Sequence, residues 1–218
     1  MMSYAQYLEK EINTMALGQP IYTKFLAKKI SKIFNLEQQA AVAATAVALK
    51  RIKDRNTILN LRCYQKGIYY LTKETPFGES GINKEQLLAD KYILQDNGYD
   101  TGLTALHHMG LTTQMPRERV IATNNVKSYM REDKKMGVIL KPARTKITAT
   151  NKLYLQTLDV LELMDRAPID AKEPYHILAN YIKKHGLKYD ILLATADKYY
   201  NKNTVLQLAH TARLGGAI

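Results

Sequence analysis

The chain has 218 residues, of which 46% are hydrophobic and 24% are charged, as in an ordinary folded protein of one large or two small domains. No segment approaches the roughly 18 consecutive apolar residues that a membrane span requires. The opening MMSYAQYLEKEI carries acidic residues where a secretion signal has a basic and then an apolar run. The single cysteine, Cys63, excludes an internal disulfide and a cysteine-based zinc site. We therefore expect a cytoplasmic protein with no membrane partner.

The charge is strongly positive, with 32 lysines and arginines against 20 acidic residues and a formal net charge of +12. Such an excess favours a polyanionic partner, chiefly nucleic acid, although lysines that only keep the protein in solution would give the same total. The position of the positive charge along the chain is more informative than its total. Between Lys24 and Lys66 ten basic residues are opposed by two acidic ones, and a second basic stretch occupies residues 127–146.

The first two predicted elements are amphipathic helices. Residues 3–15 place apolar side chains at helical spacing, with Ser3 as a candidate N-cap and Gly18 and Pro20 as the end of the helix. A second helix follows, which Thr23 can cap. Its expected apolar stripe consists of Leu26, Ile30 and Ile33.

A third helix is expected over about residues 36–53, with Asn35 as its cap. Its alanines allow close packing against neighbouring helices. The residues expected to face the core are Val42, Ala46, Leu49 and Ile52.

After Asn56 the apolar period changes. Two short aromatic and β-branched runs, 58–64 and 68–71, flank the turn Gln65-Lys66-Gly67, which predicts a β-hairpin. Three helices followed by a hairpin is the order of a winged helix-turn-helix. The sequence therefore predicts an α+β protein with this fold at its N-terminus.

In such a fold the third helix enters the major groove and the hairpin reaches the backbone or the minor groove. Gln can pair with adenine and Arg with guanine, whereas Lys suits phosphate contacts that position the protein without reading sequence. From the third helix we expect DNA contacts by Gln38, Gln39, Thr45, Lys50, Arg51 and Arg55. From the hairpin and the second helix we expect them by Arg62, Gln65, Lys66, Lys24, Lys28 and Lys29. The same residues could instead form only the solvated faces of amphipathic helices.

Two segments, ALKRIKDRNTILNLRCYQKGIYYLTKETPFG and GYDTGLTALHHMGLTTQMPRERVIATN, carry a recognisable pattern. Over about residues 18–146 the chain resembles the AbiEi-like antitoxin and regulator family of type IV toxin–antitoxin systems, and a related group of small winged-helix proteins. The matching residues before and in the wing are Leu49, Arg51, Ile52, Ile58, Gly67, Ile68, Tyr69, Thr75, Pro76, Phe77 and Gly78. Those of the next element are Thr101, Gly102, Gly110, Leu111, Thr112, Thr113, Gln114 and Pro116, with GLTTQMP the most specific part.

The sequence departs from the family pattern at three places. Asn56 replaces the usual turn glycine, which is a mild change because Asn tolerates a left-handed backbone. Gln65-Lys66 stands where Arg is commoner before the wing glycine, which puts the wing contacts in doubt. Met109 replaces the usual Leu. The resemblance implies that the winged helix binds inverted repeats in double-stranded DNA and represses its own operon. It also implies that the C-terminal part opposes a nucleotidyltransferase-like toxin protein.

The predicted boundary between two domains, 1–95 and 96–218, is the turn Gln95-Asp96-Asn97-Gly98. A linker helix, 83–93, precedes it. A mixed α/β segment over about residues 98–149 contains a short helix, 103–109, stopped by Gly110, and strands in VIAT, VKSYMRED and GVILKPART. Beyond Thr150 the pattern is helical.

Signs of catalysis are sparse. The adjacent His107 and His108 diverge on a helix, and no phosphate-binding, hydrolase or metalloprotease motif occurs. We therefore expect no enzymatic activity, catalytic residue, metal or cofactor. The acidic residues Asp159, Glu162 and Asp165 are expected to be solvated, with a basic partner surface as the alternative. The residues Thr112, Thr113 and Gln114 are expected to tie a loop together rather than to reach DNA.

The sequence thus predicts a DNA-binding transcription regulator of the antitoxin type. Lys141 and Arg144, in the second basic stretch, are expected to extend its DNA footprint. One alternative is a protein-interaction module whose positive charge seeks an acidic partner. Another is an RNA-binding accessory protein, although Tyr69 and Tyr70 resemble core residues more than a base-stacking platform. A third is an enzyme, such as a nuclease or an RNA-modifying accessory, which would need carboxylates or histidines that converge in a pocket.

Overall fold

The computed structural model describes residues 2–55, 60–94 and 96–216. The chain combines helices with β-sheets, which confirms the predicted α+β class, and divides into two compact units, Met1–Leu87 and Leu88–Ile218. The division comes earlier than the predicted one at residues 95–96. The expected linker helix consists of α4 (Lys84–Leu88) followed directly by the π-helix η1 (Ala89–Ile93), and η1 packs against strands of the second unit.

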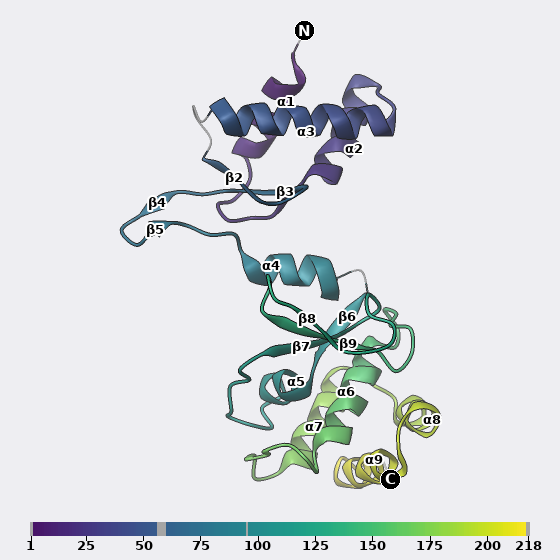
Figure 1. The fold of residues 1–218 in the computed structure, drawn as a ribbon. Helices are drawn as coiled ribbons and strands as arrows, with labels where there is room; N and C mark the ends of the chain where they lie inside the picture. The colour runs from purple at the N-terminus through teal and green to yellow at the C-terminus, as the bar shows by residue number, and fades with distance from the viewer. Residues whose placement is uncertain (1, 56–59, 95, 217–218) are drawn as a thin grey trace. The chain divides into compact units, whose positions relative to one another are not determined.

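The core of the first unit includes the helices α1 (Tyr4–Asn13), α2 (Thr23–Phe34) and α3 (Gln38–Arg55). Helix α3 packs against both of the others (Figure 1). Ser3 forms the predicted N-cap in a capping box with Gln6, whose side chain accepts from the Ser3 N–H at 2.9 Å. The core of this unit includes Leu8, Ile12, Ile30, Leu49 and Leu61.

Two predicted caps are wrong. Thr23 is the first helical residue of α2 and is buried, because Tyr22 leaves strand β1 (Ile21–Tyr22) and enters the helix directly as its N-cap. Asn35 ends α2 instead of starting α3. Its backbone is left-handed, at φ 51°, a conformation that Asn adopts more readily than most residues, and its N–H donates to the Ser31 carbonyl.

Three predicted core residues are also exposed. Ile33 and Val42 are 55% and 40% exposed, and Ala46 faces solvent. The prediction favoured large apolar side chains, whereas α3 packs through a stripe that contains small ones. Its buried residues are Ala41, Thr45, Ala48, Leu49 and Ile52.

The predicted hairpin is confirmed from residue 60 onward, while residues 56–59, with Asn56, Ile58 and Leu59, lie outside the described part. Strand β2 (Leu61–Gln65) pairs antiparallel with β3 (Ile68–Leu71), and β1 completes a sheet of order β1-β3-β2. The turn requires Gly67, whose φ is +83°. A short ribbon of β4 (Glu74–Thr75) and β5 (Gly78–Glu79) follows.

The second unit is built on a four-stranded sheet of order β6-β7-β9-β8. The strands are β6 (Gly98–Thr101), β7 (Arg119–Thr123), β8 (Arg131–Asp133) and β9 (Val138–Pro142). Strands β7 and β9 run parallel and the other pairs run antiparallel. The three predicted strand segments are therefore present, although VKSYMRED forms a strand only at Arg131–Asp133.

Helices make up the rest of this unit, as predicted. Gly110, at φ +76°, follows α5 (Gly102–His108) and its C-cap residue Met109. The C-terminal region consists of α6 (Lys152–Leu163), α7 (Pro174–Lys184), α8 (Tyr189–Tyr199) and α9 (Lys202–Leu214). Helix α6 packs against β6, α5, α8 and α9, and so occupies the centre of the unit.

Candidate nucleic-acid interface

Helix α3 has two faces of different character. Its buried stripe packs on α1 and α2, and the side chains of the opposite face are exposed. At about 100° per residue, the positions opposite the buried stripe include 39, 43, 46, 47, 50 and 54. The residues at these positions are all exposed and are Gln39, Ala43, Ala46, Val47, Lys50 and Asp54.

The residues expected to read bases do not all lie on the outward face of α3. Gln39 and Lys50 lie on this outward face, whereas Gln38, Arg51 and Arg55 are exposed but lie off it, with Gln38 beside the buried stripe. These five stay available to a partner. Thr45 does not, because its side chain is fully buried in the core, and its expected contact with DNA is wrong. Its hydroxyl also finds no hydrogen-bond partner among the described residues.

Several predicted phosphate-binding residues are exposed cations. Lys24 and Lys28 on α2, and Lys66 at the turn of the hairpin, face solvent. None of the three pairs with a carboxylate in residues 2–55, 60–94 or 96–216. Their charge is therefore not neutralised within the described part of the molecule, which favours binding to an anion.

Two other predicted contacts are paired internally. Lys29 forms an ion pair with Glu11, and the hydrogen bond between them lowers the pKa of the Glu11 carboxyl. Arg62 donates through Nε to Glu79 at 3.0 Å and pairs with it through a second nitrogen. That hydrogen bond lowers the pKa of the Glu79 carboxyl. Both cations remain at the surface, where such pairs are weak enough for a phosphate to compete.

Gln65 is half-buried at the end of β2, beside an irregularity in the β2–β3 register between Cys63 and Gln65. Cys63, which is exposed, donates from Sγ to the Gln65 carbonyl at 3.3 Å. The backbone of the turn is thus held locally, while Lys66 at its tip is exposed.

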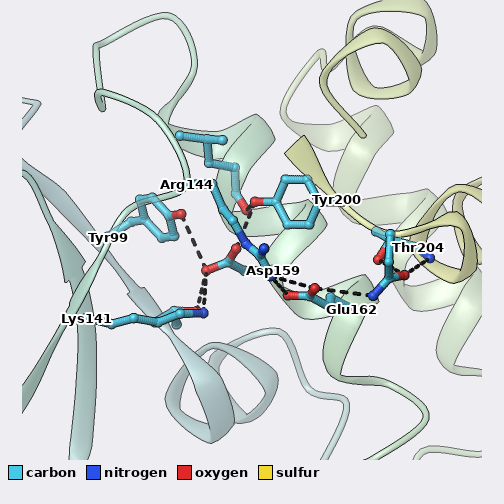
Figure 2. Close-up of polar contacts among 10 residues, drawn as sticks. Tyr99, Lys141, Arg144, Asp159, Glu162, Tyr200 and Thr204 are labelled. Carbon is cyan, nitrogen blue, oxygen red and sulfur yellow. Dashed lines mark hydrogen bonds and ion pairs between the residues drawn. The ribbon is translucent and has the colours of Figure 1, made fainter. Parts of the chain in front are cut away.

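In the second unit, the predicted DNA contacts Lys141 and Arg144 belong to an internal polar cluster (Figure 2). The Lys141 Nζ lies 3.7 Å from a carboxylate oxygen of Asp159. Arg144 donates to both carboxylate oxygens of Glu162 at 2.6 Å and stacks 5.1 Å from the centre of the Tyr200 ring. Since their charges are balanced by carboxylates, the structure gives no support to a DNA footprint at these two residues.

Asp159 is the centre of this cluster and is only 2% exposed, so its expected solvation is wrong. It accepts hydrogen bonds from Thr101 at 2.7 Å and from Tyr200 at 2.8 Å, and a longer one from Tyr99 at 3.4 Å (Figure 2). Burial and the negative charge of Asp159 raise the pKa of both tyrosine hydroxyls. The cluster ties β6 and β9 to α6 and to Tyr200, the C-cap residue of α8.

The spacing in the sequence offered a signal for this burial. Asp159 comes four residues after Leu155 and one after Leu158, both fully buried, so it lies on the apolar side of α6. Glu162 and Asp165 are likewise bonded rather than merely solvated. Glu162 binds Arg144, and Asp165 accepts from Asn203 and Gln207.

The loop after α5 has the structural role that was expected. Asp170 accepts from the Thr113 N–H at 2.8 Å and from its hydroxyl at 2.7 Å, which together lower the pKa of the Asp170 carboxyl. The Thr112 hydroxyl accepts from the Gln114 N–H at 3.2 Å. Nearby, His107 contacts the Thr112 carbonyl and His108 lies 3.7 Å from Asp100.

Within the described ranges, no group of three His, Cys, Asp or Glu side chains is arranged to hold a metal ion. No helix in the described part of the chain is both long and apolar enough to cross a membrane.

Comparison with known proteins adds no family. No protein-family model matches the sequence, and no curated protein matches it significantly.

Proposed function

We propose that this chain is a DNA-binding transcription regulator whose first unit is a winged helix-turn-helix. The order of α1, β1, α2, α3, β2 and β3, with β1 added to the β2–β3 hairpin, supports that fold. The observation that carries the proposal is the outward face of α3. It is exposed along the helix and carries an amide at Gln39 and an ammonium at Lys50, with Asp54, paired to Lys53, near the end of the helix.

The surrounding charge supports the same function. Lys24 and Lys28 on α2 and Lys66 on the hairpin have no carboxylate partner in the described residues, so their charge is available to neutralise DNA phosphates. Phosphate contacts of this kind supply affinity and position, while the side chains of α3 supply sequence selectivity.

The biological role that we propose follows from the resemblance to AbiEi-like antitoxins. The chain would bind inverted repeats upstream of its own operon in the cytoplasm, repress it, and counteract a nucleotidyltransferase-like toxin through its second unit. A nucleotidyltransferase-like gene beside its own would favour the second part.

The first test is binding of the full chain to the duplex upstream of its own gene and to a scrambled duplex of the same composition, over a series of salt concentrations. Selective binding that weakens with salt is expected. Lys24→Ala should weaken binding to both duplexes and reduce the salt slope by about 1. The matched control is Lys172→Ala, which removes an exposed lysine of the second unit and should change neither.

Equal, weak binding to both duplexes would contradict the proposal. It would favour a protein-interaction module with a basic surface. Binding of single-stranded or double-stranded RNA in preference to DNA would favour the RNA-binding alternative.

A further inference from the structure

The middle of the outward face of α3 carries no hydrogen-bonding side chain. Between Gln39 and Lys50 this face consists of Ala43, Ala46 and Val47, and Val47 is 50% exposed. An exposed helix face normally carries polar residues, because apolar side chains gain nothing there from burial. Here three short apolar side chains form a continuous row on a helix that already has a separate buried stripe.

The major groove of DNA offers such a row one apolar partner. Among the groups that base pairs present there, only the C5-methyl group of thymine is apolar, and alanine-sized side chains are suited to contact it. Short side chains also let the helix backbone approach the base edges closely. At one end of the row, Gln39 has the amide that pairs with N6 and N7 of adenine.

We propose that α3 reads A·T base pairs, with Ala43, Ala46 and Val47 packed against thymine methyl groups and Gln39 paired with an adenine. This inference rests on the proposed DNA-binding function and assigns the sequence class of the bound DNA. It also separates neighbours that the sequence left equivalent, because Gln39 lies on the outward face whereas Gln38 lies beside the buried stripe.

Charge favours DNA over a protein as the occupant of this face. The row is followed by Lys50 and, one turn later, by Asp54, whose charge is paired with Lys53 at 3.5 Å. The adjacent α2 exposes Lys24 and Lys28, which, like Lys50, have no carboxylate partner in the described ranges. A protein partner would have to supply both an apolar ridge and several carboxylates around it, whereas A·T-rich duplex DNA supplies methyl groups flanked by phosphates on both sides of the groove.

The test begins with selection of duplexes from a random-sequence pool by the full chain. The selected duplex is then synthesised with each thymine in turn replaced by deoxyuridine, which removes the methyl group and keeps the base pairing. We expect A·T-rich selected sites and a loss of roughly fourfold in affinity for each contacted thymine, as for burial of one methyl-sized group.

Variants of α3 test whether its side chains cause the difference in affinity between thymine and deoxyuridine. Val47→Ala should shrink the difference between thymine and deoxyuridine at one position. Val42→Ala is the matched control, since Val42 is 40% exposed on the same helix but lies towards its buried side, and it should leave that difference unchanged. Gln39→Ala should reduce the preference for adenine at one position by roughly tenfold.

The outcomes distinguish the two proposals. Selective binding to G·C-rich sites, or to A·T-rich sites with no effect of deoxyuridine at any position, would overturn the reading of thymine methyl groups and leave the DNA-binding function intact. Failure to select any duplex would overturn both.

Discussion

Thr45 shows how one buried hydroxyl separates stability from recognition. Its side chain is 0% exposed and its hydroxyl has no hydrogen-bond partner in the described residues. Thr45→Val keeps the shape and removes an unsatisfied polar group, so the free energy of unfolding should rise by about 1 kcal/mol, with DNA affinity unchanged. Denaturant unfolding and DNA titration measure the two effects. The control is Thr157→Val, which removes a hydroxyl that donates to the Leu153 carbonyl at 2.8 Å and should not stabilise.

Asp133 is a residue whose protonation should weaken the second unit. Burial acts to raise the pKa of its carboxyl, but hydrogen bonds from Lys91 at 2.8 Å and from Tyr92 at 2.6 Å prevail and hold that pKa below the ordinary value of about 3.9. The carboxylate therefore contributes stability above about pH 4, which is lost as the pH falls through the lower pKa of the folded state. Asp133→Asn should lower the free energy of unfolding at pH 6, and its difference from wild type should shrink near pH 3. Urea unfolding at the two pH values checks this, and an equal difference at both would contradict it.

At the scale of elements, Gly98 shows how closely η1 and the sheet approach each other. A Cβ at this first residue of β6 would lie 2.2 Å from the Tyr92 carbonyl oxygen and 2.6 Å from that of Ala122. Both are backbone atoms that cannot move aside, so Gly98→Ala should cost the upper end of the roughly 1–3 kcal/mol typical of overpacking. Gly81→Ala, where a Cβ would meet nothing within 4 Å, should be nearly neutral in the same unfolding assay.

Local sequence signals predicted most of the helices and strands. They failed where contacts between residues far apart in the sequence determine the role of a side chain. The hairpin around Gly67 and the Ser3 cap follow from turn and capping chemistry, which act over a few residues. Asn35 satisfies the chemistry of a helix start, yet the chain uses its tolerance of a left-handed backbone to end α2. The internal pairing of Arg144 with Glu162 joins residues 18 apart, and no local pattern distinguishes it from a free cation.

The candidate site could likewise be predicted only in part from the sequence. Charge density pointed to α2, α3 and the hairpin, and the exposed Lys24, Lys28, Lys50 and Lys66 remain its members. The sequence could not tell which face of α3 is outward. That depended on the choice between Ala41 and Val42 as a core residue, and the smaller one is buried because it lets neighbouring helices approach.

At the scale of the whole molecule, the free cations of the proposed DNA-binding surface belong to the first unit, Met1–Leu87, while Lys141 and Arg144 are neutralised within the second. Hydrogen exchange of the full chain with its selected duplex should therefore show added protection in α2, α3 and the β2–β3 turn, and none in β9 or α6. The same duplex with a scrambled sequence is the control, and it should protect weakly and uniformly. Specific protection of residues 138–146 would contradict this assignment, because DNA would then have to displace carboxylates from both cations, and it would restore the longer footprint that the second basic stretch predicted.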